Sequence, residues 1–204
     1  MCGITGIVNY SNEPLREVVQ MMNDALVHRG PDAGALCEYQ SCVLGHRRLS
    51  IIDLSNAANQ PMFSDDGLVA IVFNGEIYNF KELRRSLELQ GEKFRTGSDT
   101  EVLLKLYMSR GHKMLPLLNG MFSFAVWDNK QERLFFARDR LGKKPFYYCN
   151  EGTNLSFSSE LPSLLKDPNI KRVIDPQALS EYFLYDFIPA PHTIFSGVKK
   201  LPAA

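Results

Sequence analysis

Hydrophobic residues along the chain fall into short runs separated by glycine, proline and asparagine, which predicts many strands with helices among them. We expect strands in residues 1–8, 35–39, 41–52, 68–73, 123–128, 133–138, 145–149 and 155–158. We expect helices in residues 15–28, 80–89, 102–109, 160–165 and 176–185, the first of them opened by Ser11-Asn12-Glu13-Pro14. These strands are more numerous than expected for one sheet that exposes one of its faces to solvent. The pattern therefore predicts two stacked sheets with helices on the outside.

The first strand is unusual, because chain ends are ordinarily polar and frayed, whereas residues 1–8 are apolar and contain Gly3 and Gly6. If Met1 is removed, Cys2 carries a thiol and a free α-amine on one residue. An α-amine has a pKa of about 7.7–8.0, which suits a base near neutral pH. Cys2 is thus a candidate nucleophile with its own base. The alternative is that Cys2 is a small buried hydrophobic residue.

Composition places the chain among ordinary globular proteins, with 204 residues, 45% apolar and 23% charged. Its 23 Lys+Arg balance 23 Asp+Glu, so no net field attracts nucleic acid or an anionic membrane. We find no signal peptide and no apolar run long enough to span a bilayer. The four scattered cysteines lack zinc-site spacing, which predicts no metal and a reducing, cytoplasmic location.

The chain is expected to form one domain over residues 1–186. The proline-rich segment 187–204 has no clear partner within the chain, and we interpret it as the start of a linker.

Three polar features interrupt the apolar pattern. Arg47-Arg48 lies within the apolar run 44–52, where a guanidinium could grip a substrate carboxylate or form an internal salt bridge. Asn74-Gly75 follows the strand at 68–73 and supplies either oxyanion-hole donors or a tight turn. Asp99 precedes a helix and could hold a substrate ammonium, or it could cap that helix, as Ser98 could. Taken singly, each feature leaves both interpretations open.

Taken together and in order, nine stretches resemble the N-terminal half of one family, the glutamine-hydrolysing asparagine synthetases. These stretches are MCGITGIV, RGPD, LGHRRLSIIDLS, FNGEIYN, TGSDTEV, LNGMFSFAVWD, ARDRLGKKPFYY, FSSEL and FIPAPHTIFSGVKKLP. The family belongs to the class II glutamine amidotransferases, within the N-terminal-nucleophile hydrolases. The resemblance implies an α+β fold, a four-layer αββα sandwich of two stacked, mainly antiparallel sheets.

The resemblance also implies the chemistry at Cys2. After loss of Met1, the thiolate attacks the carboxamide carbon of glutamine, forms a thioester and expels ammonia, and water then releases glutamate. The Cys2 α-amine shuttles the protons, so a chain that keeps Met1 is expected to be inactive. Asn74 and the Gly75 N–H stabilise the tetrahedral oxyanion.

The same resemblance implies how glutamine is held. Arg48 binds the substrate carboxylate, and Glu76 and Asp99 hold its amino group. Backbone groups complete the pocket wall, from Leu49, Ser50, Ile51 and Ile52. For the RGPD stretch we favour a structural ion pair between Arg29 and Asp32 that supports the pocket. We interpret Arg138, Asp139 and Arg140 as structural or as part of a domain interface.

The family's second half binds ATP and aspartate through a Ser-Gly-Gly loop, and this chain has neither that loop nor a GxxxxGK[ST] motif. We therefore expect no cofactor here, with ATP and Mg²⁺ on a synthetase domain that is absent from this chain. The expected partners are glutamine, a synthetase domain or subunit and, as an option, a second copy of the chain in a homodimer.

Two rival hypotheses remain. A catalytically silent docking or dimerisation module predicts loss of Cys2, Arg48, Asn74 or Asp99, yet all four are present. An amidotransferase that serves a different acceptor is not excluded, because the acceptor would bind outside this chain.

Overall fold

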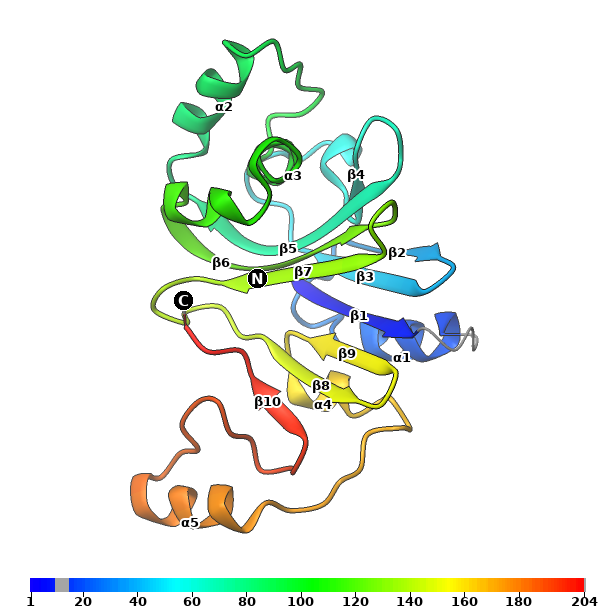
Figure 1. Ribbon diagram of the computed structural model, residues 1–204, viewed down its shortest axis with the longest axis vertical. Coiled ribbons are helices and arrows are strands. Elements are labelled where there is room, and N and C mark those ends of the chain that lie inside the picture. The colour runs from blue at the N-terminus through cyan, green and yellow to red at the C-terminus, as the bar shows by residue number, and fades with distance from the viewer. Residues whose placement is uncertain (10–14, 204) are drawn as a thin grey trace.

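The computed structural model describes residues 1–9 and 15–203. Two sheets are stacked face to face, and helices cover the outer face of each (Figure 1). This arrangement confirms the predicted α+β sandwich with its αββα layers. The predicted turn and helix start at residues 11–14 lies outside the described residues.

One sheet has six strands in the order β10-β8-β9-β1-β3-β2, and each described pairing is antiparallel. In chain order these strands are β1 (Gly3–Asn9), β2 (Ala33–Tyr39), β3 (Cys42–Arg48), β8 (Tyr147–Glu151), β9 (Asn154–Ser158) and β10 (Val198–Lys200). The other sheet has four antiparallel strands in chain order, namely β4 (Met62–Phe63), β5 (Val69–Ile77), β6 (Gly120–Asp128) and β7 (Arg133–Arg138).

The helices form the outer layers of the sandwich. On the six-stranded sheet lie α1 (Arg16–Asp24) and α4 (Leu161–Leu164), and on the four-stranded sheet lie α2 (Phe80–Glu88) and α3 (Asp99–Arg110). Two 3₁₀ segments occupy Asn56–Ala58 and Gly111–Leu117. A fifth helix, α5 (Pro176–Tyr185), projects away from both sheets (Figure 1).

Three apolar clusters fill the spaces between the four layers. The cluster between the two sheets includes Ile4, Val72, Ala125, Trp127 and Phe157. A second joins the four-stranded sheet to α2 and α3, and a third joins the six-stranded sheet to α1 and α4. Each sheet is therefore buried on both faces, which explains why strands such as β1 are continuously apolar.

Strand β1 is central in its sheet, between β3 and β9. Gly6 allows this close packing, because a Cβ there would lie 2.7 Å from the Phe157 ring. The apolar start of the chain is thus an interior strand, and it fixes Cys2 at one end of the sandwich.

Several boundaries differ from those predicted. Strand β3 ends at Arg48 rather than at 52, because residues 49–52 leave the sheet and Ile51 is 71% exposed. Strand β5 does not end at 73: it continues through Asn74 and Gly75 to Ile77, paired with β6 throughout. The alternative of a tight turn at Asn74-Gly75 is therefore wrong.

The view of residues 187–204 as a segment without a partner is also wrong in part. Val198–Lys200 forms β10, paired with β8, and Val198 is fully buried. Leu201 N–H donates to the Phe146 carbonyl at 2.9 Å, so pairing continues just past the strand. A short strand among prolines gives too weak a periodic pattern to be recognised in the sequence.

Candidate active site

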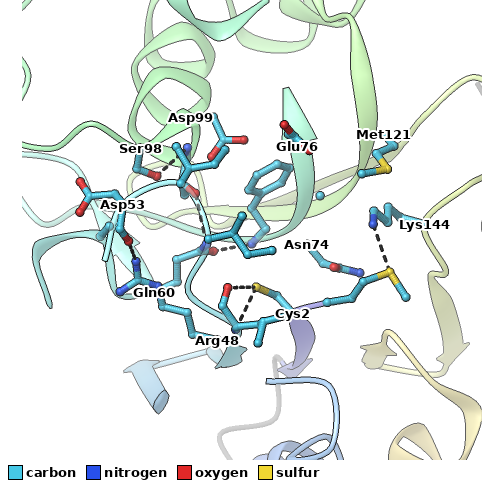
Figure 2. Close-up of a pocket in the computed structure, with 18 residues that line it drawn as sticks. Cys2, Arg48, Asp53, Gln60, Asn74, Glu76, Ser98, Asp99, Met121 and Lys144 are labelled. Carbon is cyan, nitrogen blue, oxygen red and sulfur yellow. Dashed lines mark hydrogen bonds between the residues drawn. The ribbon is translucent and has the colours of Figure 1, made fainter. Parts of the chain in front are cut away.

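A pocket opens where four elements meet: the start of β1, the end of β3, the end of β5 and the start of α3 (Figure 2). In the β1–β3 register Gly3 faces Arg47, so the pairing brings Cys2 beside the end of β3. Predicted site residues that line the pocket are Cys2, Arg48, Leu49, Ile51, Ile52, Asn74, Gly75, Glu76 and Asp99. The pocket also includes Met1, Asp53, Ala58, Gln60, Phe73, Ser98, Thr100, Met121 and Lys144.

Cys2 lies half-buried with its sulfur against the backbone of Leu49. The Leu49 N–H donates to Sγ at 3.4 Å, and Sγ lies 3.7 Å from the Leu49 carbonyl oxygen. Burial raises the pKa of the Cys2 thiol, and the Leu49 hydrogen bond opposes that rise only in part. The sulfur is therefore held mainly as a thiol at neutral pH, so attack on a substrate needs a nearby base.

Asn74 provides a free hydrogen-bond donor in this pocket. Its side chain is 1% exposed, and its Nδ2 has no hydrogen-bond partner among the described residues. An unpaired buried amide costs stability, and a donor of this kind is the element that an oxyanion hole requires. Gly75 follows it, and a Cβ there would lie 2.2 Å from the Met121 carbonyl oxygen, so only glycine fits at this pairing with β6.

Two carboxylates lie on the opposite side of the pocket from Cys2 (Figure 2). Glu76 is half-buried on β5, and Asp99 is buried in the first turn of α3, with Oδ2 accepting the Ile77 N–H at 3.0 Å. Burial raises the pKa of Asp99 to about 6, and the charge of Glu76 adds to that rise. A cationic group placed between these carboxylates would relieve their repulsion.

Ser98, rather than Asp99, caps α3, because its side chain accepts the Thr100 N–H at 3.0 Å. Asn79 stands directly before α2, but its side chain forms no capping hydrogen bond with that helix. Instead its amide bridges the Leu117 carbonyl and the Asn119 N–H, at 3.0 Å each.

Arg48 lines the pocket, and its guanidinium also fastens the loop that follows it. Nη1 donates to the Ser55 carbonyl at 2.8 Å and to Asn59 Oδ1 at 2.6 Å, and Nη2 donates to the Asp53 carbonyl. A guanidinium has five N–H donors, so these bonds leave donors for a ligand. The structure thus shows a loop-anchoring contact for Arg48, and its contact with a substrate carboxylate stays a prediction.

Of the four residues expected to form the pocket wall, Ser50 is not among those that line the cavity. Its N–H donates to Asp32 Oδ2 at 2.8 Å. Asp32 does not pair with Arg29 as expected. Arg29 forms an ion pair with Glu160 at 2.8 Å and donates to the Cys2 carbonyl at 2.9 Å, so both residues support the pocket through other partners.

Gln60 joins two walls of the pocket, although its sequence context does not indicate such a role. Its Oε1 accepts the Phe73 N–H at 2.6 Å, and its Nε2 donates to Thr100 Oγ1 at 3.2 Å. The stretch Asn59-Gln60-Pro61 has the composition of a loop, and no local pattern indicates that this loop folds into the interior.

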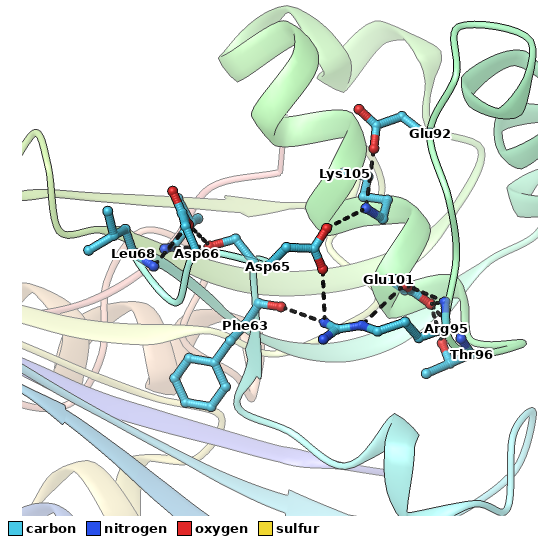
Figure 3. A network of polar contacts seen from close by, with 11 residues as sticks. Phe63, Asp65, Asp66, Leu68, Glu92, Arg95, Thr96, Glu101 and Lys105 are labelled. Carbon is cyan, nitrogen blue, oxygen red and sulfur yellow. Dashed lines mark hydrogen bonds and ion pairs between the residues drawn. The ribbon is translucent and has the colours of Figure 1, made fainter.

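Glu101 is a second residue that the sequence did not single out. It is 2% exposed, and its carboxylate accepts the N–H groups of Arg95 and Thr96, the shortest contact being 2.7 Å (Figure 3). Lys105, one turn further along α3, pairs with Asp65 and Glu92. This network fixes the loop that leads into Ser98 and therefore the position of Asp99.

Among residues 1–9 and 15–203, no group of three or more His, Cys, Asp or Glu side chains is placed to hold a metal ion. The same residues contain no helix with the length and apolar character needed to cross a bilayer.

The stacked sheets, with a cysteine at the start of an interior strand beside an unpaired amide donor, define a sandwich of the N-terminal-nucleophile hydrolase type. Among solved structures, the chain is similar to a glutamine phosphoribosylpyrophosphate amidotransferase from B. subtilis. The TM-score is 0.67 at 25% identity, over 79% of this chain and 42% of that one. A model of the glutamine amidotransferase domain matches residues 1–204, and the chain belongs to that family.

Two relatives match the whole of this chain. It is 43% identical to the putative glutamine-hydrolyzing asparagine synthetase 2 of Methanocaldococcus jannaschii and covers 43% of that protein. It is 41% identical to the glutamine-hydrolyzing asparagine synthetase 3 of Bacillus subtilis and covers 34% of it. The chain thus spans less than half the length of these relatives.

Proposed function

We propose that this chain, once Met1 is removed, hydrolyses glutamine to glutamate and ammonia through a thioester on Cys2. The observation that carries the proposal is the Asn74 amide, a buried donor without a partner that lines the same pocket as the Cys2 thiol. Such a donor is satisfied when the carboxamide oxygen of a substrate becomes an oxyanion.

The reaction proceeds in two balanced steps. In the first, the Cys2 α-amine takes the thiol proton, Sγ bonds to the carboxamide carbon, and the C–N bond breaks as the proton passes to the leaving ammonia. In the second, water attacks the thioester, the C–S bond breaks and the thiol is restored as glutamate leaves. In both tetrahedral intermediates the oxyanion accepts hydrogen bonds from Asn74 Nδ2 and the Gly75 N–H.

The charges around the pocket suit a zwitterionic amino acid. Arg48 offers its remaining guanidinium donors to the α-carboxylate, while Asp99 and Glu76 face the α-ammonium. The wall formed by Leu49, Ile51 and Ile52 holds the side chain between them. Three charged residues at one end of the substrate, one cation and two anions, select an amino acid over a simple amide.

The ammonia would serve an ATP-dependent synthetase domain or subunit, since the relatives are named asparagine synthetases and are more than twice as long. ATP and Mg²⁺ would bind there and not on this chain. Helix α5 supports such a partner, because it carries exposed large apolar side chains that include Phe183, at 77%, and Leu184, at 70%. The four cysteines are free thiols, in keeping with a cytoplasmic enzyme.

The test is glutamate release from glutamine by the purified chain, after intact mass has shown that Met1 is absent. We expect Cys2→Ala to abolish release and Asn74→Ala to lower kcat by about 10²–10³. Cys37→Ala is the matched control, because Cys37 is buried in β2 away from the pocket and its loss should leave the rate unchanged.

Failure of the correctly processed chain to release glutamate would contradict independent activity and favour the silent module. Equal release of ammonia from asparagine or simple amides would contradict glutamine as the substrate. Neither assay identifies the acceptor, for which production of asparagine with an added synthetase domain, aspartate and ATP is the direct measurement.

A further inference from the structure

Lys144 is a buried lysine that the proposed reaction does not use. Its side chain is 6% exposed and enters the pocket on the far side of Cys2 from Arg48 (Figure 2). Its Nζ donates to the Met1 sulfur at 3.2 Å, and no carboxylate in the described part of the chain lies within ion-pair distance. Buried lysines are usually paired, so this one is unusual.

The loop that carries Lys144 is built to hold it in place. Asp139 is 2% exposed, and its two carboxylate oxygens accept the N–H groups of Leu141, Lys143 and Lys144 at 2.9–3.1 Å. Arg138 Nε donates to the Lys144 carbonyl at 2.6 Å. The ARDRLGKKP stretch is thus a well-braced turn, and it holds a cation in the same pocket as the nucleophile.

Met1 is the residue whose removal creates the active terminus, and it is also the residue that Lys144 contacts. When Met1 leaves, the Lys144 ammonium loses its partner, and the nitrogen of Cys2 becomes a terminal amine in the same pocket. A cation near an amine disfavours protonation of that amine, because two positive charges would then repel each other, and burial of Lys144 reduces the screening of its charge by water.

We propose that Lys144 is a positioning residue that keeps the α-amine of Cys2 neutral, and so able to accept the thiol proton near neutral pH. The kinetic part of this inference rests on the proposed glutaminase activity, whereas the charge state of the amine can be measured without it.

Other charged groups around Lys144 bear on its own charge. The pKa of Lys144 is lowered, by burial first and then by the charge of Arg29, while Cys2, Asp139 and Glu76 oppose that shift. The Cys2 sulfur in turn faces Arg48 and Asp99. Of the cations, Arg48 and Arg29 are held by other partners, and Lys144 alone among these three has no anionic or carbonyl partner in the described residues.

The experiment titrates the Cys2 α-amine directly, by NMR of protein labelled with ¹⁵N-cysteine and shown by mass to lack Met1. In the unaltered chain we expect a pKa below the ordinary value of about 7.7–8.0. Lys144→Met, which keeps the length and removes the charge, should raise it by about one unit, whereas Lys144→Arg should restore it. Lys143→Met is the matched control, since Lys143 is the exposed neighbour on the same turn.

Kinetics provide an independent measurement. Lys144→Met should lower kcat/KM for glutamine about tenfold at the acidic limb of the pH profile, with recovery at alkaline pH and KM changed less than about twofold. A loss of rate that is equal at every pH, with an unshifted α-amine, would overturn the proposal and leave a structural role. If Lys144→Met does not fold, an α-amine in the unaltered chain that titrates at or above its ordinary value overturns it equally.

Discussion

At the scale of single residues, Asp99 shows how a binding site reduces the stability of the free protein. Its carboxylate is buried next to Glu76, and both burial and that neighbouring charge favour the protonated form. Above pH 6 the folded protein therefore holds an ionised group that it disfavours, and a substrate ammonium would remove this penalty.

Replacing Asp99 by Asn tests this balance. The pKa of Asp99 is raised from 3.8 to about 6, so its ionised form costs stability at pH 7, and that cost disappears as the pH falls from about 6 to below 3.8. At about 1.4 kcal/mol per unit, Asp99→Asn should raise the free energy of unfolding at pH 7 by up to about 3 kcal/mol. Urea denaturation at pH 7 and at pH 4 measures the effect.

The same variant should bind glutamine more weakly at pH 7, because the neutral amide cannot pair with the ammonium. KM of the unaltered chain should rise as the pH falls through about 6, and KM of Asp99→Asn should not follow that change. A variant that is both no more stable and no weaker in binding would show that Asp99 does not face the substrate.

Residues of the pocket could be predicted from the sequence where their residue types made them candidates and several motifs together resembled one family. Cys2, Asn74 and Asp99 were assigned to one site in this way, and the structure places them around one pocket. Gln60 and Lys144 were not identified, because their importance depends on which distant segments pack against them. Lys144 and Met1 are 143 residues apart in the sequence, and no local pattern contains that contact.

At the scale of elements, the sequence located the main strands and helices but misplaced several ends. Apolar periodicity predicted the core of β5, whereas its continuation over Asn74, Gly75 and Glu76 depends on pairing with β6. On the Arg48 side of the pocket the predicted strand was too long rather than too short. Apolar Ile51 and Ile52 were expected to extend β3, but they line the cavity instead.

Gly75 is the position where this pairing leaves no room for a side chain. Gly75→Ala places a Cβ 2.2 Å from the Met121 carbonyl oxygen and 2.7 Å from the Phe122 Cα. We expect a loss of about 1–3 kcal/mol or more in the free energy of unfolding, because both neighbours are backbone atoms of β6.

Gly97→Ala is the matched control for this prediction. A Cβ on Gly97 would meet Asp53 Oδ2 at 3.6 Å, an ordinary contact, so its stability should change little. Thermal unfolding of both variants compares them, and equal melting temperatures would show that β5 and β6 separate easily at Gly75.

At the scale of the whole molecule, the C-terminal segment closes one edge of the six-stranded sheet. Deleting the residues after Gly197 removes β10, the buried Val198 and the Leu201 carbonyl that Arg138 contacts at 2.7 Å. Burial of one valine alone contributes about 1.5–3 kcal/mol, so the free energy of unfolding should fall by at least about 2 kcal/mol.

Deletion of only the last two residues is the control, since Ala203 is exposed and should contribute little. Chemical denaturation distinguishes the two truncations. An unchanged midpoint for the longer deletion would mean that β10 adds nothing to the domain and that the segment acts as a linker after all.

The central position of β1 has a consequence for when the enzyme can mature. An aminopeptidase that cuts after Met1 needs an extended, accessible chain start, yet residues 3–9 are buried between β3 and β9. Asn154, the partner of Asn9, leaves the ribosome about 145 residues later, on the order of 10–30 s at ordinary synthesis rates. During this interval the whole chain start is free of its sheet, whereas after folding only Met1 itself, 57% exposed at the pocket, is left for the aminopeptidase to reach.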